Sequence, residues 1–240
     1  MPNHRYIDFL AKLAVDNAHP GGHGLTEAII EQLSIRKNSS LLDVGCGTGA
    51  TTVFIAEKLH ADVTGIDLHP GMVKRAKARA AVSTSAPKIV LASAEQLPFE
   101  SNYFDYLLSE SVTAFTDVSL SVPEYYRVLK PEGQLAAIEM TVEKQPNEQD
   151  KRLIESVYGV SDVRTENEWL SIWKSAGFIN LKSFHANEIK THSGDVLPTY
   201  NLTSIIDEGA IEVWLEHMQM MQKFKDVLTY RVFTMSKPSD

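Results

Sequence analysis

The sequence predicts an α/β protein built on a doubly wound, mostly parallel open sheet. Three observations predict it: strand-like and helical runs alternate, the loops between them are short, and a glycine-rich turn follows the first strand of this alternation. Parallel strands need crossover connections, which helices supply, and these crossovers are expected to be right-handed. Such sheets bind ligands at the carboxyl ends of their strands, so a site is expected there.

The alternation begins near residue 40 and is the clearest part of the pattern. Strands are predicted at 41–44, 62–67, 88–91, 104–108 and 134–140, and helices at 51–59, from Pro70 to about 80, and at 118–129. Pro70 suits the first turn of its helix, where a missing N–H costs nothing. The segment 131–133 is predicted to be a turn before the fifth strand.

Both flanks are expected to be partly helical. A short helix is predicted near 6–13 and a second at 26–33 with Thr26 as its N-cap, separated by a loop at 19–24 that contains one proline and three glycines. After the alternation, a helix at 166–176 is expected to end at Gly177, followed by a strand-rich stretch at 178–189. A helix near 203–224, inserted as a lid or an interface, is expected before a final strand at 227–235.

Composition restricts the class of protein. The 240 residues carry a formal net charge of −8, which argues against nucleic-acid binding. The basic residues Lys74, Arg75, Lys77 and Arg79 are interpreted as the solvated face of one helix. One cysteine, no long apolar run and no signal-type N-terminus predict a cytoplasmic protein without a membrane span.

The strongest local signal is the turn Asp43-x-Gly45-x-Gly47-x-Gly49 between a strand and a helix. Glycines let the backbone approach a ligand closely, and the helix that follows presents free N–H groups. A nicotinamide-binding loop has a similar pattern, and a tight turn without a ligand would also satisfy it. Asp67 ends the second strand and can accept hydrogen bonds from both hydroxyls of a ribose. A helix N-cap is the alternative role for Asp67.

Four blocks of the sequence occur in an order that indicates a family. They are Leu41–Gly49, Asp67, the loop Ser93-Ala94-Glu95-Gln96-Leu97-Pro98-Phe99 followed by Phe104-Asp105, and the turn Arg127-Val128-Leu129-Lys130-Pro131-Glu132-Gly133. Together they resemble class I S-adenosylmethionine-dependent methyltransferases, nearest to the ubiquinone/menaquinone-type small-molecule branch. Glu132 stands where the family usually has glycine, and Gly133 retains the backbone freedom.

The resemblance implies a Rossmann-like sheet of seven strands with an antiparallel last strand, helices on both faces, an N-terminal helical cap and a helical insertion before the last strand. It implies one methyltransferase domain over 1–240, with the cap at 1–37, a cofactor-binding core at 38–141 and a substrate-side part at 142–240 whose helical insertion lies near 190–225. The cofactor would be S-adenosyl-L-methionine, with S-adenosyl-L-homocysteine as the product.

The resemblance also implies roles for individual residues. The glycines would pass close to the methionine portion, Asp67 would bind the ribose, and Ser109 and Glu110 would lie near the methionyl amine and the methyl group. The cofactor-binding residues expected in full are Gly45, Cys46, Gly47, Thr48, Gly49, Asp67, Leu68, Met72, Ser93, Ala94, Glu95, Ser109, Glu110 and Ser111. Asp43 is expected to order the loop rather than to touch the cofactor.

Substrate-side residues are less strongly indicated. His19, His23, Phe115 and Glu139 are the candidates, and His23 and Glu139 are also candidate general bases. A metal site at His19 and His23 is not expected, because Pro20-Gly21-Gly22 would prevent the helix that such spacing needs. Cys46 is not expected to act as a nucleophile, because no paired base is evident.

The sequence therefore predicts a methyltransferase that acts on a small molecule by in-line displacement, as a monomer or a homodimer. Acidic and aromatic residues, Glu110, Glu139 and Phe115, would suit a cationic amine as acceptor. Two alternatives stay open at this point. One is a nicotinamide-dependent oxidoreductase with the same glycine loop, and the other is a non-catalytic cofactor-binding protein.

Overall fold

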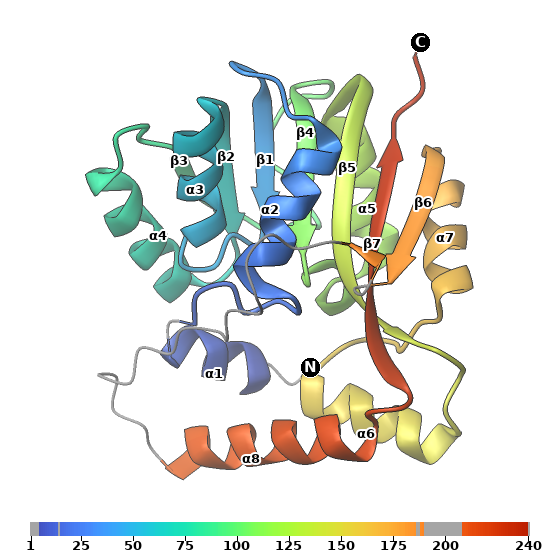
Figure 1. Ribbon diagram of the computed structural model, residues 1–240. Helices are drawn as coiled ribbons and strands as arrows, with labels where there is room; N and C mark the ends of the chain where they lie inside the picture. The colour runs from blue at the N-terminus through green and yellow to red at the C-terminus, as the bar shows by residue number, and fades with distance from the viewer. Residues whose placement is uncertain (1–4, 14, 186–187, 190–207, 240) are drawn as a thin grey trace.

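A computed structural model describes residues 5–13, 15–185, 188–189 and 208–239. Seven strands form one sheet in the order β3-β2-β1-β4-β5-β7-β6 (Figure 1). The strands are β1 Ser40–Val44, β2 Asp62–Asp67, β3 Lys88–Leu91, β4 Phe104–Glu110, β5 Leu129–Val142, β6 Ile179–His185 and β7 Leu228–Ser236. β1 to β5 pair in parallel, and β7 runs antiparallel to both β5 and β6. The expected Rossmann-like fold, with its antiparallel last strand, is confirmed.

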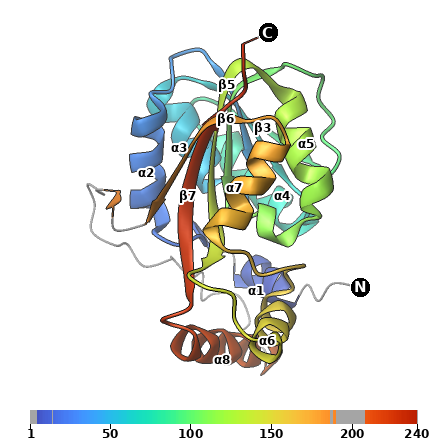
Figure 2. The same cartoon turned by 90° about the vertical axis from the view of Figure 1, so that its right-hand side faces the viewer.

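Helices cover both faces of this sheet. They are α1 Arg5–Leu13, α2 Gly22–Leu33, α3 Ala50–Leu59, α4 Pro70–Val82, α5 Val118–Val128, α6 Glu148–Tyr158, α7 Glu166–Ser175 and α8 Glu208–Lys223, with a 3₁₀ turn, η1, at Thr113–Phe115. Figure 2 shows α2 and α3 on one face and α5 and α7 on the other. Each face has its own apolar core: Ile29 and Ile55 belong to the first, and Trp169 and Trp173 to the second. These four side chains are fully buried, so both layers are held by apolar burial.

Three helices gather at one end of the sheet. α1, α6 and α8 contact one another there, below the sheet in the view of Figure 1. The ring of Tyr6 in α1 packs edge-on against Tyr158 in α6 and lies 5.4 Å from the ring of His217 in α8. Arg5 in α1 also pairs with Glu212 in α8 at 2.9 Å. The three helices form a cap at the end of the sheet where the site lies.

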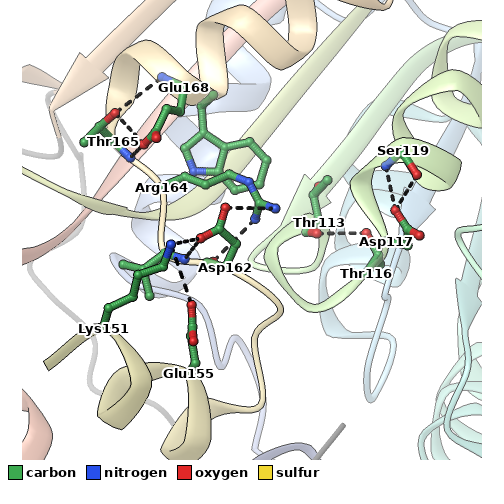
Figure 3. Close-up of polar contacts among 12 residues, drawn as sticks. Thr113, Thr116, Asp117, Ser119, Lys151, Glu155, Asp162, Arg164, Thr165 and Glu168 are labelled. Atoms are coloured by element: carbon green, nitrogen blue, oxygen red, sulfur yellow. Dashed lines mark hydrogen bonds and ion pairs between the residues drawn. The ribbon is translucent and has the colours of Figure 1, made fainter. Parts of the chain in front are cut away.

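The connection from α6 to α7 is fixed by local polar contacts (Figure 3). Asp162 pairs with Lys151 of α6 at 2.6 Å and with Arg164 at 3.7 Å. Thr165 and Glu168 form a capping box that starts α7, each side chain accepting from the backbone N–H of the other. The helical cap of α1, α6 and α8 is thereby tied to the face of the sheet that α5 and α7 cover.

Several sequence-based boundaries were wrong. α2 begins at Gly22, after Gly21 in the left-handed region with φ 77°, so Thr26 lies inside the helix and is not its N-cap. The helix therefore starts within the predicted loop, because its first residues are glycines that read as breakers. β5 also extends through the predicted turn at 131–133. α6 was not predicted, and residues 203–207 of the expected inserted helix lie outside the described residues.

The basic face of α4 is not simply solvated, as was expected. Arg79 pairs with Asp16 at 2.8 Å, and Arg75 donates to the carbonyl oxygen of Ala11. Lys74 and Lys77 are exposed. Two of the four cations therefore hold the N-terminal segment against α4. None of the helices in the described part of the chain is long and apolar enough to cross a bilayer.

Candidate functional site

A cavity of about 260 Å³ lies at the carboxyl ends of β1, β2 and β4. The glycine loop, the end of β2, the loop after β3 and the segment after β4 form its walls. Residues of α1 and of the connection to α2 complete it, among them Ile7, Leu10, Val15 and His19. The site therefore lies where a doubly wound sheet is expected to bind its ligand.

The three glycines of the loop have different local tasks. All three have positive φ, which other residues rarely adopt. A Cβ added to Gly45 would lie 2.3 Å from Val112 Cγ2, and one added to Gly49 would lie 3.0 Å from the Cα of Ala76 in α4. A Cβ on Gly47 would meet nothing within 4 Å. Gly47 therefore borders open space, whereas Gly49 is needed for the packing of α3 on α4.

Asp67 links the end of β2 to the glycine loop. Its Oδ2 accepts a hydrogen bond from the Gly47 backbone N–H at 2.9 Å, and its Oδ1 accepts from the His69 N–H at 2.7 Å. Burial raises the pKa of this carboxyl. The N-cap of α4 is His69, whose Nδ1 accepts from Gly71 at 3.1 Å, so the N-cap alternative for Asp67 was wrong.

Asp43 is almost completely buried, at 2 % exposure, and still borders the cavity. Its Oδ2 accepts a hydrogen bond from the Thr52 hydroxyl of α3 at 2.5 Å. Burial, and then the charge of nearby Glu110, raise the pKa of Asp43 to about 8. Asp43 thus holds the start of α3, and it also contributes to the wall of the site.

Glu110 is the last residue of β4 and is held by side chains from other elements. The hydroxyl of Thr26 in α2 donates to its Oε1 at 2.6 Å, and the hydroxyl of Thr51 in α3 donates to its Oε2 at 2.9 Å. The Nε2 of His19 lies 3.4 Å from Oε2. This carboxylate therefore joins α2, α3, β4 and the α1–α2 connection at the cavity.

The part of the cavity next to Leu68 and Met72 is suited to a flat apolar group. Leu68, directly after β2, leaves 67 % of its surface exposed, which is unusual for leucine, and it borders the cavity with Met72. The loop after β3 faces them. There the Glu95 side chain accepts from the Asp117 N–H at 2.8 Å, and Ser93 Oγ accepts from the Glu95 N–H at 3.1 Å. This loop is thus tied to the start of α5.

Most of the residues predicted for the cofactor meet at this cavity. Those that border it are Gly45, Cys46, Gly47, Thr48, Asp67, Leu68, Met72, Ser93, Ala94, Glu95, Glu110 and Ser111, and of the substrate candidates His19 and Phe115. Gly49 and Ser109 are not among the lining residues; Ser109 is fully buried, with its hydroxyl 3.0 Å from that of Thr113. His23 and Glu139 do not border the cavity either.

Glu139, a candidate substrate-side residue and general base, lies away from the cavity. It is fully buried in β5, which has β4 on one side and β7 on the other. Its oxygens accept from the backbone N–H groups of Thr113 at 3.1 Å and Ala114 at 3.0 Å. Burial raises its pKa to about 7. Glu139 therefore holds η1 in place through these two backbone hydrogen bonds.

Two further candidates have structural roles. The ring of His23 packs edge-on against Phe54 at 4.4 Å, within the α2–α3 face. Cys46 is buried, and burial together with the charge of Asp43 raises the pKa of its thiol. A protonated thiol is a weak nucleophile, which agrees with the prediction for Cys46.

Sequence reasoning missed the part of the site that comes from distant segments. The polar residues missed are Asn17, Thr26, Thr51 and Thr116, and the apolar ones are Ile7, Leu10, Val15, Ala18 and Val112. Thr51 lies two residues after the recognised glycine loop, and the others lie farther from any recognised block. The amphipathic pattern of α1 indicated burial of one face but not what that face covers.

Comparisons with known proteins agree with this geometry. Residues 42–137 match the family model described as a methyltransferase domain. An uncharacterized methyltransferase of Bacillus subtilis is 32 % identical over 231 residues, which cover 95 % of this chain and 97 % of that protein. A demethylmenaquinone methyltransferase of Staphylococcus aureus is 29 % identical over 69 % of this chain and 79 % of its own length.

Solved structures share the fold at low sequence identity. A phosphoethanolamine N-methyltransferase of Haemonchus contortus, crystallised with S-adenosyl-L-methionine, superposes with a TM-score of 0.79 at 18 % identity, covering 98 % of this chain and 57 % of that one. The MccD protein superposes with a TM-score of 0.74 at 21 % identity, covering 92 % of this chain and all of that one.

Fold, site and relatives together define an S-adenosylmethionine-dependent methyltransferase. More particularly, the chain belongs to the methyltransferase domain family. The comparisons do not favour the nicotinamide-dependent alternative.

Proposed function

We propose that the protein transfers the methyl group of S-adenosylmethionine to a small-molecule acceptor inside this cavity. The observation that carries the proposal is the enclosure of the site. α1 and the connection to α2 form one wall, to which Leu10, Val15 and His19 contribute. A site walled on that side suits a small molecule better than a segment of a macromolecule.

The residues of the cavity fit the cofactor. Asp43, Asp67 and Glu110 are three of the four acidic residues that border the cavity, and burial raises the pKa of the first two. A ligand with a sulfonium and an ammonium group would favour their ionised forms. Asp67 would accept from the ribose hydroxyls, and the exposed Leu68, with Met72, would cover the adenine.

The remaining cofactor contacts are assigned to other residues that border the cavity or lie next to it. Gly45 and Gly47 let the backbone approach the methionine portion, and Cys46, Thr48 and Ser111 lie beside them. Ala94 would offer a backbone N–H and Glu95 an acceptor to the adenine edge. Gly49 and Ser109 support this wall without bordering the cavity, so they are proposed as structural neighbours of the cofactor site.

The bound cofactor supplies a methyl group that its sulfonium already activates. The protein must align the acceptor with that methyl group and exclude water. Apolar side chains border the acceptor side, including Ile7, Leu10 and Phe115, and they would keep water out of the transfer site. His23 and Glu139 do not reach the cavity, so neither is proposed as a general base.

The acceptor is proposed as a small molecule without a commitment to amines. The expectation of a cationic amine depended on Glu110, Glu139 and Phe115 acting together. Glu139 lies outside the cavity, in contact with Thr113 and Ala114. The named relatives support the coarser proposal, since demethylmenaquinone and phosphoethanolamine, which appear in their names, are both small molecules.

Two measurements test the proposal. Calorimetry with S-adenosylmethionine, S-adenosylhomocysteine and NADH should show binding of the first two alone. Mass spectrometry after incubation with amine, phenol, carboxylate and quinol panels should then show a gain of one methyl group in a small acceptor. Binding of NADH alone, or methylation of protein or nucleic acid with no small acceptor turned over, would contradict the proposal.

A further inference from the structure

His19 lies in the connection between α1 and α2, far from Glu110 in the sequence and next to it in space. Its side chain is 5 % exposed and that of Glu110 is 7 % exposed. The His19 Nε2 is 3.4 Å from Glu110 Oε2 and 3.2 Å from the Thr26 Oγ1. Both His19 and Glu110 border the cavity. The histidine therefore belongs to the polar cluster around this carboxylate.

The hydrogen-bond partners define which atoms of the cluster carry protons. The His19 Nδ1 lies 3.1 Å from the carbonyl oxygen of Pro20, which can only accept, so Nδ1 carries a proton. Thr26 has a single hydroxyl proton, and its short 2.6 Å contact with Glu110 Oε1 uses it. The Thr26 oxygen can then only accept from His19 Nε2. His19 Nε2 thus donates to Thr26, and the same nitrogen lies 3.4 Å from Glu110 Oε2.

The charges around the cavity give this arrangement a consequence for ligand binding. Among the lining residues that the structure describes there is no lysine or arginine, whereas Asp43, Asp67, Glu95 and Glu110 are acidic. His19 is thus the lining side chain, in the described part of the chain, that can balance a carboxylate. The 3.4 Å contact with Glu110 Oε2 becomes an ion pair when the ring is protonated.

We propose that His19 is a positioning residue, which acts through Glu110 in cofactor capture. It donates to Thr26, whose hydroxyl in turn donates to Glu110 Oε1, and its ring lies 3.4 Å from Glu110 Oε2, so it helps to hold the Glu110 carboxylate in one orientation at the end of β4. It also ties the α1–α2 connection, which walls the cavity, to that carboxylate. This inference rests on the proposed function, because it takes the cavity to be the cofactor site.

A double-mutant cycle on S-adenosylhomocysteine binding, measured by calorimetry, tests the inference. His19→Ala and Glu110→Gln are each expected to raise the Kd by about 10-fold or more. Because His19 acts through Glu110, the double variant should be no more than about 3-fold weaker than Glu110→Gln alone. His19→Gln, which keeps a donor, should recover most of the affinity. If His19→Ala does not fold, His19→Asn, which is too short to reach Glu110, replaces it in the cycle.

His23→Ala is the matched control, because His23 lies four residues away and packs on Phe54 outside the cavity. Its Kd should stay within about 2-fold of the wild-type value. ¹⁵N spectra of the wild-type protein should show a proton on Nε2 of His19.

Three results would overturn the inference: a His19→Ala Kd equal to that of the control, fully additive effects in the cycle, or an unprotonated Nε2. Failure of the proposed function would look different. In that case wild-type protein and His23→Ala would both fail to bind S-adenosylhomocysteine or to methylate any small acceptor.

Discussion

Glu139 in β5 accepts a hydrogen bond at 3.0 Å from the backbone N–H of Ala114 in η1. A strand carboxylate thereby fixes the short turn that carries Phe115 to the cavity wall. The neighbouring N–H of Thr113 bonds the other oxygen at 3.1 Å, so both carboxylate oxygens are used. This side chain is costly to replace with an amide, because the NH₂ group of the amide would face one of the two backbone donors.

We therefore expect Glu139→Gln to lower the free energy of unfolding by about 1–3 kcal/mol, since the amide NH₂ would face one of the two N–H donors. Urea denaturation measures this loss. Glu132→Gln, at an exposed position of the same strand, is the control and should change stability by less than about 0.5 kcal/mol. Equal effects of the two substitutions would contradict a structural role for Glu139.

The same residue predicts a pH dependence of stability. Burial raises the pKa of Glu139 from 4.5 to about 7 in the folded state, so folding favours the protonated form. Its contribution is fully present below about pH 4.5 and is lost as the pH rises through about 7. The stability difference between wild type and Glu139→Gln should therefore shrink over this interval. A difference that grows with pH would contradict the assigned burial.

Much of the fold could be predicted because it depends on local pattern. The predicted strands 41–44, 62–67 and 88–91 agree closely with β1, β2 and β3, respectively. The glycine loop and Asp67 could be located because they are adjacent to strand ends. α6 was missed even though Asn147 caps it and Gly159 follows it in the left-handed region. Its apolar residues Leu153, Ile154, Val157 and Tyr158 recur at helical spacing, so a local helical signal was present and was overlooked.

The errors in the site concern relationships between distant segments. His19, Thr26 and Thr51 meet at Glu110, yet Thr26 and Glu110 are 84 positions apart. No local pattern reports such a contact. Glu139 was placed wrongly because strand periodicity does not show how much of a strand pairs with a neighbour. β7 pairs with β5 along Gln134–Val142, so Glu139 lies within the sheet and not at its end. The sequence therefore indicates which residues end a strand but not which of them face the cavity.

Asp67 offers a direct test of the proposed cofactor site. Asp67→Asn removes a carboxylate oxygen near the Gly47 N–H and the proposed ribose position. We expect the Kd for S-adenosylhomocysteine to rise by about 10-fold, which corresponds to about 1.4 kcal/mol. Asp62→Asn, at the exposed start of the same strand, should leave the Kd unchanged. Calorimetry on both variants decides the matter, and an unchanged Kd for Asp67→Asn would refute the ribose assignment.

Asp43 predicts a proton release on cofactor binding. Its pKa is raised to about 8, so at pH 7 the carboxyl is mainly protonated before binding. A cationic ligand favours the ionised form and lowers this pKa, so S-adenosylmethionine should bind more tightly as the pH rises toward 8. Calorimetry in two buffers of different ionisation enthalpy should detect the released proton. Asp43→Asn should remove most of the release, and proton uptake by wild type would contradict the prediction.

Gly47 and Gly49 should separate ligand binding from folding. An alanine Cβ at Gly49 would lie 3.0 Å from the Cα and Cβ of Ala76, so Gly49→Ala combines a positive-φ strain with a clash between α3 and α4. We expect a stability loss of about 2 kcal/mol or more.

A Cβ at Gly47 meets no protein atom within 4 Å, so Gly47→Ala should cost only about 1 kcal/mol of backbone strain. That Cβ would point into space proposed for the cofactor, and the Kd for S-adenosylhomocysteine should rise by about 10-fold. Denaturation and calorimetry on both variants test the contrast. A Gly47→Ala variant that binds as tightly as wild type would show that the cofactor does not approach the loop at this point.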